Sequence, residues 1–414
     1  MQKKSKLFFA LIFLLIAALA CANPLGGSAP APVNVETIVA ATFQALTASA
    51  PGSEPTQLPQ PPVQDSTSSL LPHSIYFLNT DSAALAQVYR LERDGKTVTQ
   101  ITFEPAKVEY YDVSVVDGSV AYITNNKMYT VNADGSNRAM IVDGGVADEN
   151  NPYLTNISNP VFSPDAQTIA FGYKGLNFYS IVSGQSNRVL ENQINDLGDG
   201  LLVPQEMYWP EKYTADGSKL IITLGYYEGA SAAVYYPNGN ALVRLKDGEG
   251  AFICCGNTEL TADGSAFYAA YPSLGMFAPG LWRVDTSTGA VTTLINGDPG
   301  NGTFHFADDP YLAPDGQLYY FYTSLPSGQE FINRPPLQLV RAAADGVTNR
   351  TVLRPETYEN ANESLWAPDA SFVVIAEAPI QEVYQGGMVK LIYTDGQKGV
   401  ISLIPFAMEM KWGP

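Results

Sequence analysis

Side chains that could perform catalysis are few in this sequence of 414 residues. Its two histidines are His73 and His305, and Asp308 and Asp309 follow His305 closely. A Ser-His-acid triad would have to use His305 with one of these acids, but the sequence has no Gly-x-Ser-x-Gly turn. We therefore expect a non-enzymatic protein. The alternative is a carbohydrate-active hydrolase or lyase with paired carboxylates, which the 41 Asp and Glu residues leave open.

Metal ligands are also scarce, and we expect neither a metal nor a cofactor. The two histidines and the adjacent Cys254 and Cys255 lack the spacing of an ordinary four-ligand zinc site, in which two to four residues separate the cysteines. The run 195–200 partly matches a calcium loop, but Leu197 stands where a ligand is needed. For Cys254 and Cys255 we expect two reduced, buried thiols, with a vicinal disulfide as the alternative in an oxidising compartment.

Two turn motifs that repeat through residues 73–414 indicate the elements that carry these side chains. The first is a tight turn between apolar alternating stretches, which predicts a β-hairpin whose two central residues both have positive φ. It occurs at Asp94-Gly95, Asp134-Gly135, Ser183-Gly184, Asn238-Gly239, Thr288-Gly289, Asp345-Gly346 and Asp395-Gly396. A spacing of about 50 residues, with four strands in each unit, is typical of a β-propeller blade.

The second motif lies midway between the hairpins and closes the innermost strand of a blade onto its second strand. Examples are Ser163-Pro164-Asp165 and Ala313-Pro314-Asp315-Gly316. Pro presets the backbone of such a turn, and the Asp side chain can accept a hydrogen bond from the backbone two residues later. The two motifs interleave throughout, and they predict an all-β, seven-bladed propeller over residues 73–414.

The first blade lacks one strand in this pattern. Residues 73–79, 87–92 and 98–103 supply three strands before the next unit begins. The C-terminal Trp412-Gly413-Pro414 is similar to Trp366-Ala367-Pro368, which ends the innermost strand of the last blade. We therefore expect the C-terminal strand to complete the first blade, which removes exposed sheet edges.

The Ser-Pro-Asp and Ala-Pro-Asp-Gly turns, together with the hairpins over residues 89–95 and 129–135, resemble the TolB-type, WD-like propeller repeats of exported bacterial proteins. The resemblance covers roughly residues 74–414. It implies a seven-bladed ring that acts as a binding platform, often for peptides or envelope proteins.

The N-terminal segment has the features of an export signal. Lys3, Lys4 and Lys6 precede an apolar run of 14 residues ending at Ala20, which is shorter than the ~20 residues of a membrane span. Residues 1–20 are therefore predicted to be a signal peptide. The site before Cys21 resembles that of bacterial lipoproteins, in which the cysteine carries the lipid, and ordinary secretory cleavage is the alternative. We expect a protein anchored on the extracytoplasmic side, at the cell surface or in the periplasm.

Residues 21–72 are predicted to form a Pro- and Ser-rich tether, in which residues 34–48 have the periodicity of a short helix. The net charge of −18 excludes nucleic acid as a partner. It does not identify the ligand that the exported domain binds.

A binding face is predicted where the loops between blades and the loops between second and third strands emerge together. The inter-blade loops 144–158, 192–208 and 297–309 are long and acidic, the last with Asp308 and Asp309. Aromatic side chains are expected in the other loops, at Tyr226, Tyr227, Tyr271, Phe277, Phe331 and Tyr384. Such a face can bind a protein, peptide or glycan. The alternative is that the aromatics only pack the loops and that the protein is a structural scaffold of an envelope complex.

Overall fold

The computed structural model describes residues 69–148, 151–198, 201–248, 250–327 and 334–414. The predicted signal peptide (1–20), Cys21, the helical segment 34–48, the tether as far as residue 68, and Phe331 lie outside the described residues. Regular structure in the described part is almost entirely β-strand, with the short helix α3 (Pro152–Thr155). No helix in these ranges has the length and apolar character of a membrane span.

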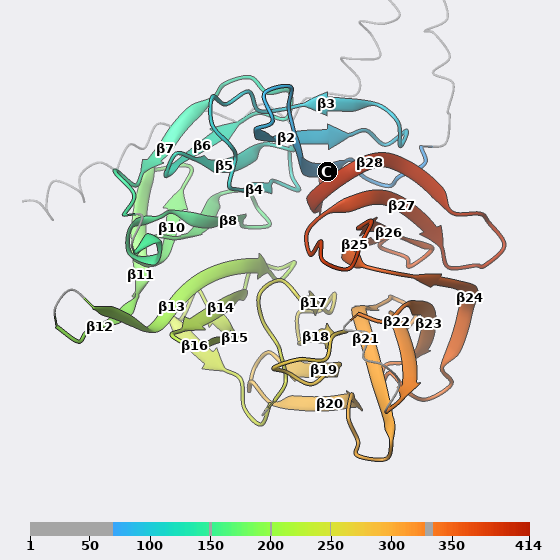
Figure 1. The fold of residues 1–414 in the computed structure, drawn as a ribbon. Helices are drawn as coiled ribbons and strands as arrows, with labels where there is room; N and C mark the ends of the chain where they lie inside the picture. Colours follow the sequence, from blue (N-terminus) through green and yellow to red (C-terminus); the bar gives the residue numbers. More distant parts are fainter. Residues whose placement is uncertain (1–68, 149–150, 199–200, 249, 328–333) are drawn as a thin grey trace, which may run out of the picture. The chain divides into compact units, whose positions relative to one another are not determined.

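The strands form antiparallel sheets that follow one another around a ring (Figure 1). Four sheets consist of four consecutive strands: β4 (Tyr110–Val113), β5 (Val120–Thr124), β6 (Lys127–Val131) and β7 (Ala139–Asp143); β8 (Ser158–Phe162), β9 (Thr168–Gly172), β10 (Gly175–Ser180) and β11 (Gln185–Glu191); β17 (Thr258–Leu260), β18 (Ala266–Tyr271), β19 (Gly280–Asp285) and β20 (Val291–Asn296); β21 (Thr303–Leu312), β22 (Gln317–Pro326), β23 (Leu337–Ala343) and β24 (Thr351–Tyr358). A five-stranded sheet contains β12 (Gln193–Asp196), β13 (Leu202–Tyr213), β14 (Leu220–Tyr226), β15 (Gly229–Tyr236) and β16 (Ala241–Arg244).

The remaining sheet has seven strands and joins the two ends of the ring. Its order is β25 (Ala361–Trp366), β26 (Phe372–Glu377), β27 (Gly387–Tyr393), β28 (Ile401–Trp412), β1 (Ile75–Thr80), β2 (Ala86–Leu91) and β3 (Val98–Gln100). The first half of β28 pairs with β27, with Ile401 opposite Leu391, and the second half pairs with β1, with Trp412 opposite Ile75. The prediction that the C-terminal strand completes the first blade is confirmed. Division of this sheet within β28 gives seven units over the described residues, six with four strands and one with five.

The core of the ring lies between neighbouring sheets. Seven buried clusters occur among the described residues, each combining side chains from consecutive units. One packs Tyr76 and Val88 of the first unit against Tyr111 and Tyr122 of the second. Burial of one large apolar side chain stabilises a fold by about 1.5–3 kcal/mol. The alternating apolar residues of the strands therefore hold the ring together by packing between the faces of neighbouring sheets.

The ring begins before His73. Leu71, which the sequence places in the tether, is fully buried in the cluster that also contains Phe77 and Leu391. Its backbone N–H donates to the carbonyl oxygen of Arg93 at 3.0 Å. The last residues of the predicted tether therefore belong to the packed ring.

The repeated turns form as predicted in position but not in backbone conformation. Gly95 has a φ of 70° and its N–H donates to the Glu92 carbonyl oxygen at 2.9 Å. Asp94 does not share the positive φ, and Oδ1 of its side chain accepts the N–H of Lys96 at 2.8 Å. The prediction of two positive φ angles in each turn is wrong, because these are longer hairpin loops that end in one left-handed glycine. In the Asn238-Gly239 hairpin the positive φ lies at Asn240.

Two of the predicted inter-blade loops are largely strand. Most of the segment 192–208 forms the hairpin of β12 and β13, in which Asp196 pairs with Leu202. In the segment 297–309, β21 begins at Thr303, so Asp308 and Asp309 lie within the innermost strand of their blade. The strands in both segments extend beyond the main part of the blade. Polar side chains on such an extension make its sequence resemble that of a loop.

Candidate binding site on the loop face

The candidate site lies where several connections emerge together. Because the strands of a blade are antiparallel, the β14–β15, β18–β19, β22–β23 and β26–β27 connections lie on the same face as the β24–β25 connection between blades. We call this the loop face. It contains the predicted site residues that the structure describes, apart from Asp308 and Asp309, which reach it from β21.

The aromatic residues of the loop face divide into two groups. Tyr227 is 67% exposed and Tyr384 is 61% exposed, whereas Tyr226 is only 37% exposed. The Arg334 guanidinium lies 5.3 Å from the centre of the Tyr384 ring, a cation–π contact. Tyr227 and Tyr384 are therefore the predicted aromatics that remain most available to a partner.

Tyr271 and Phe277 pack within their own part of the face. Their rings lie 5.0 Å and 4.8 Å from Phe252, respectively, and 6.4 Å from each other. Met276, between them in sequence, is 91% exposed. We call Phe252, Tyr271, Met276 and Phe277 the apolar shelf. The sequence analysis did not single out Phe252 or Met276. Met276 precedes Phe277 directly, in a loop that was predicted to carry aromatic side chains.

Asp308 and Asp309 lie at an irregularity of β21. The register with β22 shifts between Asp308 and Tyr311, and Asp309 has a φ of 49°. The Asp309 N–H donates to Oδ1 of Asp308 at 3.0 Å, and its carbonyl oxygen accepts the indole N–H of Trp366 at 3.0 Å. Regular alternation along a strand would point two consecutive acids to opposite faces of the sheet. The bulge at Asp309 interrupts this alternation.

Both acids line a pocket in the loop face, which we call the acidic pocket. Its volume is about 310 Å³ when space continuous with solvent is included. The lining residues are Pro272, Asp308, Asp309, Phe321, Arg334, Pro335, Leu337, Tyr358, Asn360 and Ala361. The structure thus brings predicted Asp308 and Asp309 together with Arg334 and Asn360, which the sequence analysis did not single out. Residues 334 and 360 are distant from 308 in sequence, and no local pattern connects them.

Burial changes the proton affinity of the two acids. It raises the pKa of Asp308 well above its usual value, an effect that the Asp309 carboxylate reinforces. Burial likewise raises the pKa of Asp309 to about 6, although the Arg334 charge opposes the shift. Two adjacent acids that share a desolvated site do not both ionise readily. The pair therefore carries less than two full negative charges near neutral pH.

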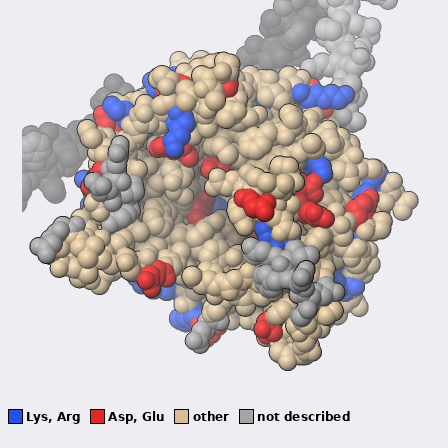
Figure 2. Space-filling model, viewed as in Figure 1, with Lys and Arg blue, Asp and Glu red and all other residues tan. Residues whose placement is uncertain are grey.

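Other acids on the innermost strands already have partners. The Glu363 carboxylate accepts the backbone N–H groups of Glu409 and Met410, each at 2.8 Å. Lys411 bonds Asp112 at 2.8 Å, in an ion pair between β28 and β4. Figure 2 shows Asp and Glu side chains around the hollow near the middle of the ring. The partners of Glu363 and Asp112 indicate a role in joining blades.

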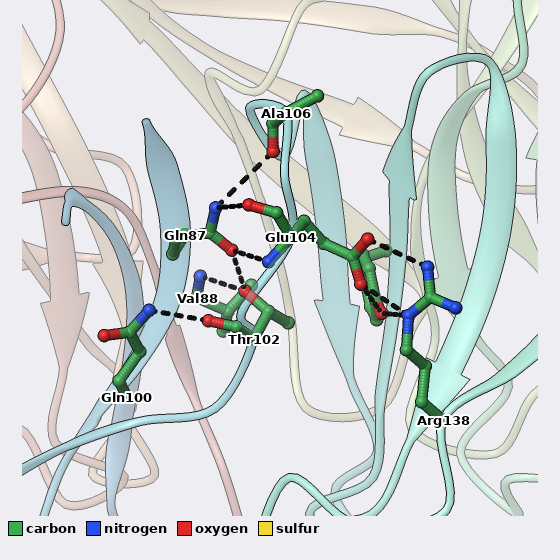
Figure 3. A network of polar contacts seen from close by, with 8 residues as sticks. Gln87, Val88, Gln100, Thr102, Glu104, Ala106 and Arg138 are labelled. Carbon is green, nitrogen blue, oxygen red and sulfur yellow. Dashed lines mark hydrogen bonds and ion pairs between the residues drawn. The ribbon is translucent and has the colours of Figure 1, made fainter. Parts of the chain in front are cut away.

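A buried polar network between the first two units also has a structural role (Figure 3). Nε2 of Gln87 donates to the Glu104 carbonyl oxygen at 3.0 Å, and Oε1 of Gln87 accepts the Thr102 hydroxyl at 2.9 Å. The Glu104 carboxylate accepts Nε of Arg138 at 2.6 Å and the Tyr122 hydroxyl at 2.6 Å. Burial raises the pKa of Glu104, but these donors outweigh it and lower the pKa overall. This acid therefore stays ionised as part of the structure.

The side chain of His305 has a tyrosine as its hydrogen-bond partner. Its Nδ1 lies 2.7 Å from the Tyr322 hydroxyl, and the two rings stack at 6.2 Å. Burial lowers its pKa, and the charge of Arg350 adds to the shift. His305 is therefore a packed, neutral side chain bonded to a tyrosine.

Cys254 and Cys255 form a disulfide, so the expectation of two reduced, buried thiols is wrong. Cys254 is buried but Cys255 is exposed. The backbone N–H of Cys255 donates to Oε1 of Glu211 at 2.7 Å and to Oγ1 of Thr223 at 3.0 Å. The bond thus lies in an anchored turn just before β17. In the described ranges, no group of three or more His, Cys, Asp or Glu side chains is placed to hold a metal ion.

Neither a protein-family model nor a curated protein matches the sequence. Similar solved structures include TolB from Acinetobacter baumannii, with 14% identity and a TM-score of 0.41 over 82% of each chain. A structure from a study of two prolyl endopeptidases has 13% identity and a TM-score of 0.53, over 82% of this chain and 49% of its own. Prolyl oligopeptidase B from Galerina marginata has 12% identity and a TM-score of 0.50, over 81% of this chain and 49% of its own.

The chain thus spans about half the length of these two peptidases. At such identities the matches show the fold alone. Taken with the ring of antiparallel sheets, the two peptidase structures show that the described residues of 69–414 have a β-propeller fold.

Proposed function

We propose that this protein is a non-enzymatic, exported lipoprotein whose loop face binds a segment of a protein or peptide. One observation carries the proposal: exposed Tyr227 and Tyr384 share the loop face with the acidic pocket. Aromatic side chains around a small polar pocket are typical of recognition sites in which a few residues supply most of the binding energy. A glycan is the alternative ligand, because sugar rings also stack on tyrosine.

The proposed location follows from the N-terminal sequence. Residues 1–20 would direct export, Cys21 would carry the lipid, and the tether as far as residue 68 would hold the ring away from the membrane. The resemblance of the turn repeats to those of exported bacterial proteins supports this proposal.

The alternative function is a carbohydrate-active hydrolase or lyase. Asp308 and Asp309 favour it to a limited degree, because burial raises both pKa values and an acid that stays protonated near neutral pH can donate a proton. Their adjacency argues against it, since glycosidase carboxylates usually flank the scissile bond from opposite sides. Release of reducing sugar from a panel of envelope polysaccharides would overturn the non-enzymatic assignment.

The binding proposal is tested with the full-length protein in mild detergent. The protein and its Tyr227→Ala/Tyr384→Ala double variant are each applied to a glycan panel and to an envelope extract, and each captured molecule is then purified and titrated. We expect a purified peptide or protein partner to lose affinity for the double variant by about tenfold or more. A matched control changes exposed Val116 and Val182 to Ala, since both lie in turns on the opposite face.

If the purified partner binds the Tyr227→Ala/Tyr384→Ala variant as tightly as it binds the control variant, the proposal that this face is the binding site is overturned. Loss of affinity only in the control variant would place the site on the opposite face. Unchanged melting temperatures would show that neither pair of substitutions disturbs the ring.

A further inference from the structure

The acidic pocket contains buried polar atoms that lack partners. Oδ2 of Asp309, Oδ1 of Asn360 and the hydroxyl of Tyr358 are buried and have no hydrogen-bond partner, and the first two can only accept hydrogen bonds when Asp309 is ionised. Asn360 is only 8% exposed. Buried polar atoms in native proteins are nearly always satisfied. Since Asp309 and Asn360 both line the pocket, a bound group that donates hydrogen bonds would meet this requirement.

Neither Arg334 nor the Tyr358 hydroxyl donates to these two acceptors in the structure, although both residues line the same pocket. The Arg334 guanidinium nitrogens donate to the carbonyl oxygens of Val383 at 3.3 Å and Ala361 at 3.1 Å, and to Oδ1 of Asn362 at 2.7 Å. These bonds hold Arg334 against the neighbouring blade. Arg334 therefore contributes positive charge that partly offsets the acid pair, and a ligand can supply the missing donors.

The size of the pocket restricts what the ligand can be. Its interior has room for about one water-sized group, and Pro272, Phe321, Pro335 and Leu337 make much of the wall apolar. A primary ammonium group is about as large as water and carries three N–H donors. A calcium ion needs six to eight oxygen ligands, more than the pocket side chains supply.

We propose that the acidic pocket binds a primary ammonium group, either the N-terminus of a peptide or the side chain of a lysine. The inference rests on the proposed function and names the chemistry of its ligand. Asp309 and Asn360 accept hydrogen bonds from the ammonium, and Asp308 is the second acid that lines the pocket. Binding removes the unmet acceptors and places a positive charge next to a desolvated acid pair, where electrostatic attraction is stronger than in water.

The surface next to the pocket suits the rest of such a ligand. Pro272 lines the pocket and directly follows Tyr271 of the apolar shelf. Met276 extends the shelf into solvent, being 91% exposed. An apolar side chain near the ammonium group would contact this shelf.

Charge in the pocket makes the binding depend on pH. The charged groups that act on the pair are Arg334 from the β22–β23 connection, Glu363 from β25 and Glu259 from β17, and a hydrogen bond from the hydroxyl of Ser364 opposes the rise in the pKa of Asp309. The pKa of Asp309 is about 6, so the acid is protonated increasingly below that pH. A protonated carboxyl attracts a cation less, and affinity should fall as the pH drops through 6.

The test uses isothermal titration of the full-length protein at neutral pH with three synthetic peptides. The first is Ala-Phe-Gly-Gly amide with a free N-terminus, the second is its N-acetylated form, and the third is acetyl-Gly-Lys-Phe-Gly amide. We expect at least one ammonium-bearing peptide to bind about tenfold or more tightly than the acetylated peptide. A preference for the first indicates recognition of a peptide N-terminus, and a preference for the third indicates recognition of lysine.

Two variants locate the effect and one serves as a control. Asp309→Asn and Asn360→Ala should each reduce the difference in affinity between the ammonium-bearing peptide that binds and the acetylated peptide without an ammonium group. Asp315→Asn removes the same charge from an exposed turn on the opposite face and should preserve it. The comparison on the unchanged protein needs no variant, so misfolding of a variant does not decide the result.

The outcomes separate this inference from the proposed function. Equal binding of all three peptides would overturn the ammonium assignment while the loop face remained a peptide-binding surface. No binding of any peptide would also overturn it and leave water as the occupant of the pocket. The envelope-extract titration would then decide the proposed function by itself.

Discussion

The indole N–H of Trp412 donates a hydrogen bond to the carbonyl oxygen of Trp366 at 3.0 Å. These tryptophans occupy similar positions, since each ends the innermost strand of its blade and is followed by a small residue and proline. Next to this bond, Trp412 lies opposite Ile75 in the ladder of β28 and β1. The bond therefore joins the end of the chain to the last blade while the strand pairing joins it to the first.

Removal of residues 406–414 should destabilise the whole ring. The deletion exposes the edge of β1 and removes Ala407 and Met410 from the buried cluster that joins the first and last blades. We expect loss of cooperative thermal unfolding, measured by circular dichroism and calorimetry. Trp412→Phe keeps the apolar ring but loses the N–H donor, and should cost only about 1 kcal/mol. A deletion variant as stable as the intact protein would show that the closing strand is dispensable.

Stability should pass through a maximum at acidic pH. The turn acids Asp94, Asp216, Asp263 and Asp285 have pKa values lowered to about 2, chiefly by hydroxyl donors of nearby Ser or Thr side chains. Their contribution to the free energy of unfolding is present above the usual Asp pKa of 3.8 and is lost as the pH falls towards 2.

The acidic pocket has the opposite effect. Because the pKa of Asp309 is raised from 3.8 to about 6, the folded state binds more protons than the unfolded state between these values, and stability falls as the pH rises through that interval. Asp309→Asn should therefore reduce the decrease in urea-unfolding free energy between pH 4 and pH 6. Asp315→Asn serves as the control, and an unchanged pH profile for Asp309→Asn would contradict the assigned shift.

The disulfide predicts a specific labelling pattern. Under native, non-reducing conditions, Cys254 and Cys255 should not react with maleimide. After reduction the exposed Cys255 should react, whereas the buried Cys254 should react only when the protein is also unfolded. Mass spectrometry of the peptide that contains both residues would show a two-dalton difference on reduction, as expected for one disulfide. Labelling of Cys255 before reduction would show that the thiols are free in solution.

Lipid attachment predicts where the protein is found in cell fractions. The unchanged protein should sediment with membranes and partition into detergent, while Cys21→Ser should be released or retain its leader. Membrane extraction followed by mass analysis of the N-terminal peptide provides the measurement. If Cys21→Ser partitions as the unchanged protein does, lipid on Cys21 is not the anchor.

The sequence alone determined the architecture of the ring. Turn residues recur at a nearly constant spacing, and apolar residues alternate between them, so local chemistry specifies both hairpins and sheet faces. The missing strand of the first blade was also visible, because Trp412-Gly413-Pro414 repeats the end of an earlier strand. Each of these signals lies within a few residues, which is the range over which turn geometry and strand periodicity act.

Only the tertiary structure decided the composition of the candidate site. Asp308 and Asp309 were found from sequence, but the bulge that places both in one pocket depends on pairing between β21 and β22. Arg334 joins them from the β22–β23 connection of the same blade, and Asn360 joins them from the β24–β25 connection to the next blade. Likewise, the exposure of Tyr227 and the packing of Tyr271 against Phe252 follow from loop conformation. Sequence patterns record local periodicity, whereas burial and unmet hydrogen bonds arise from contacts between segments that are distant along the chain.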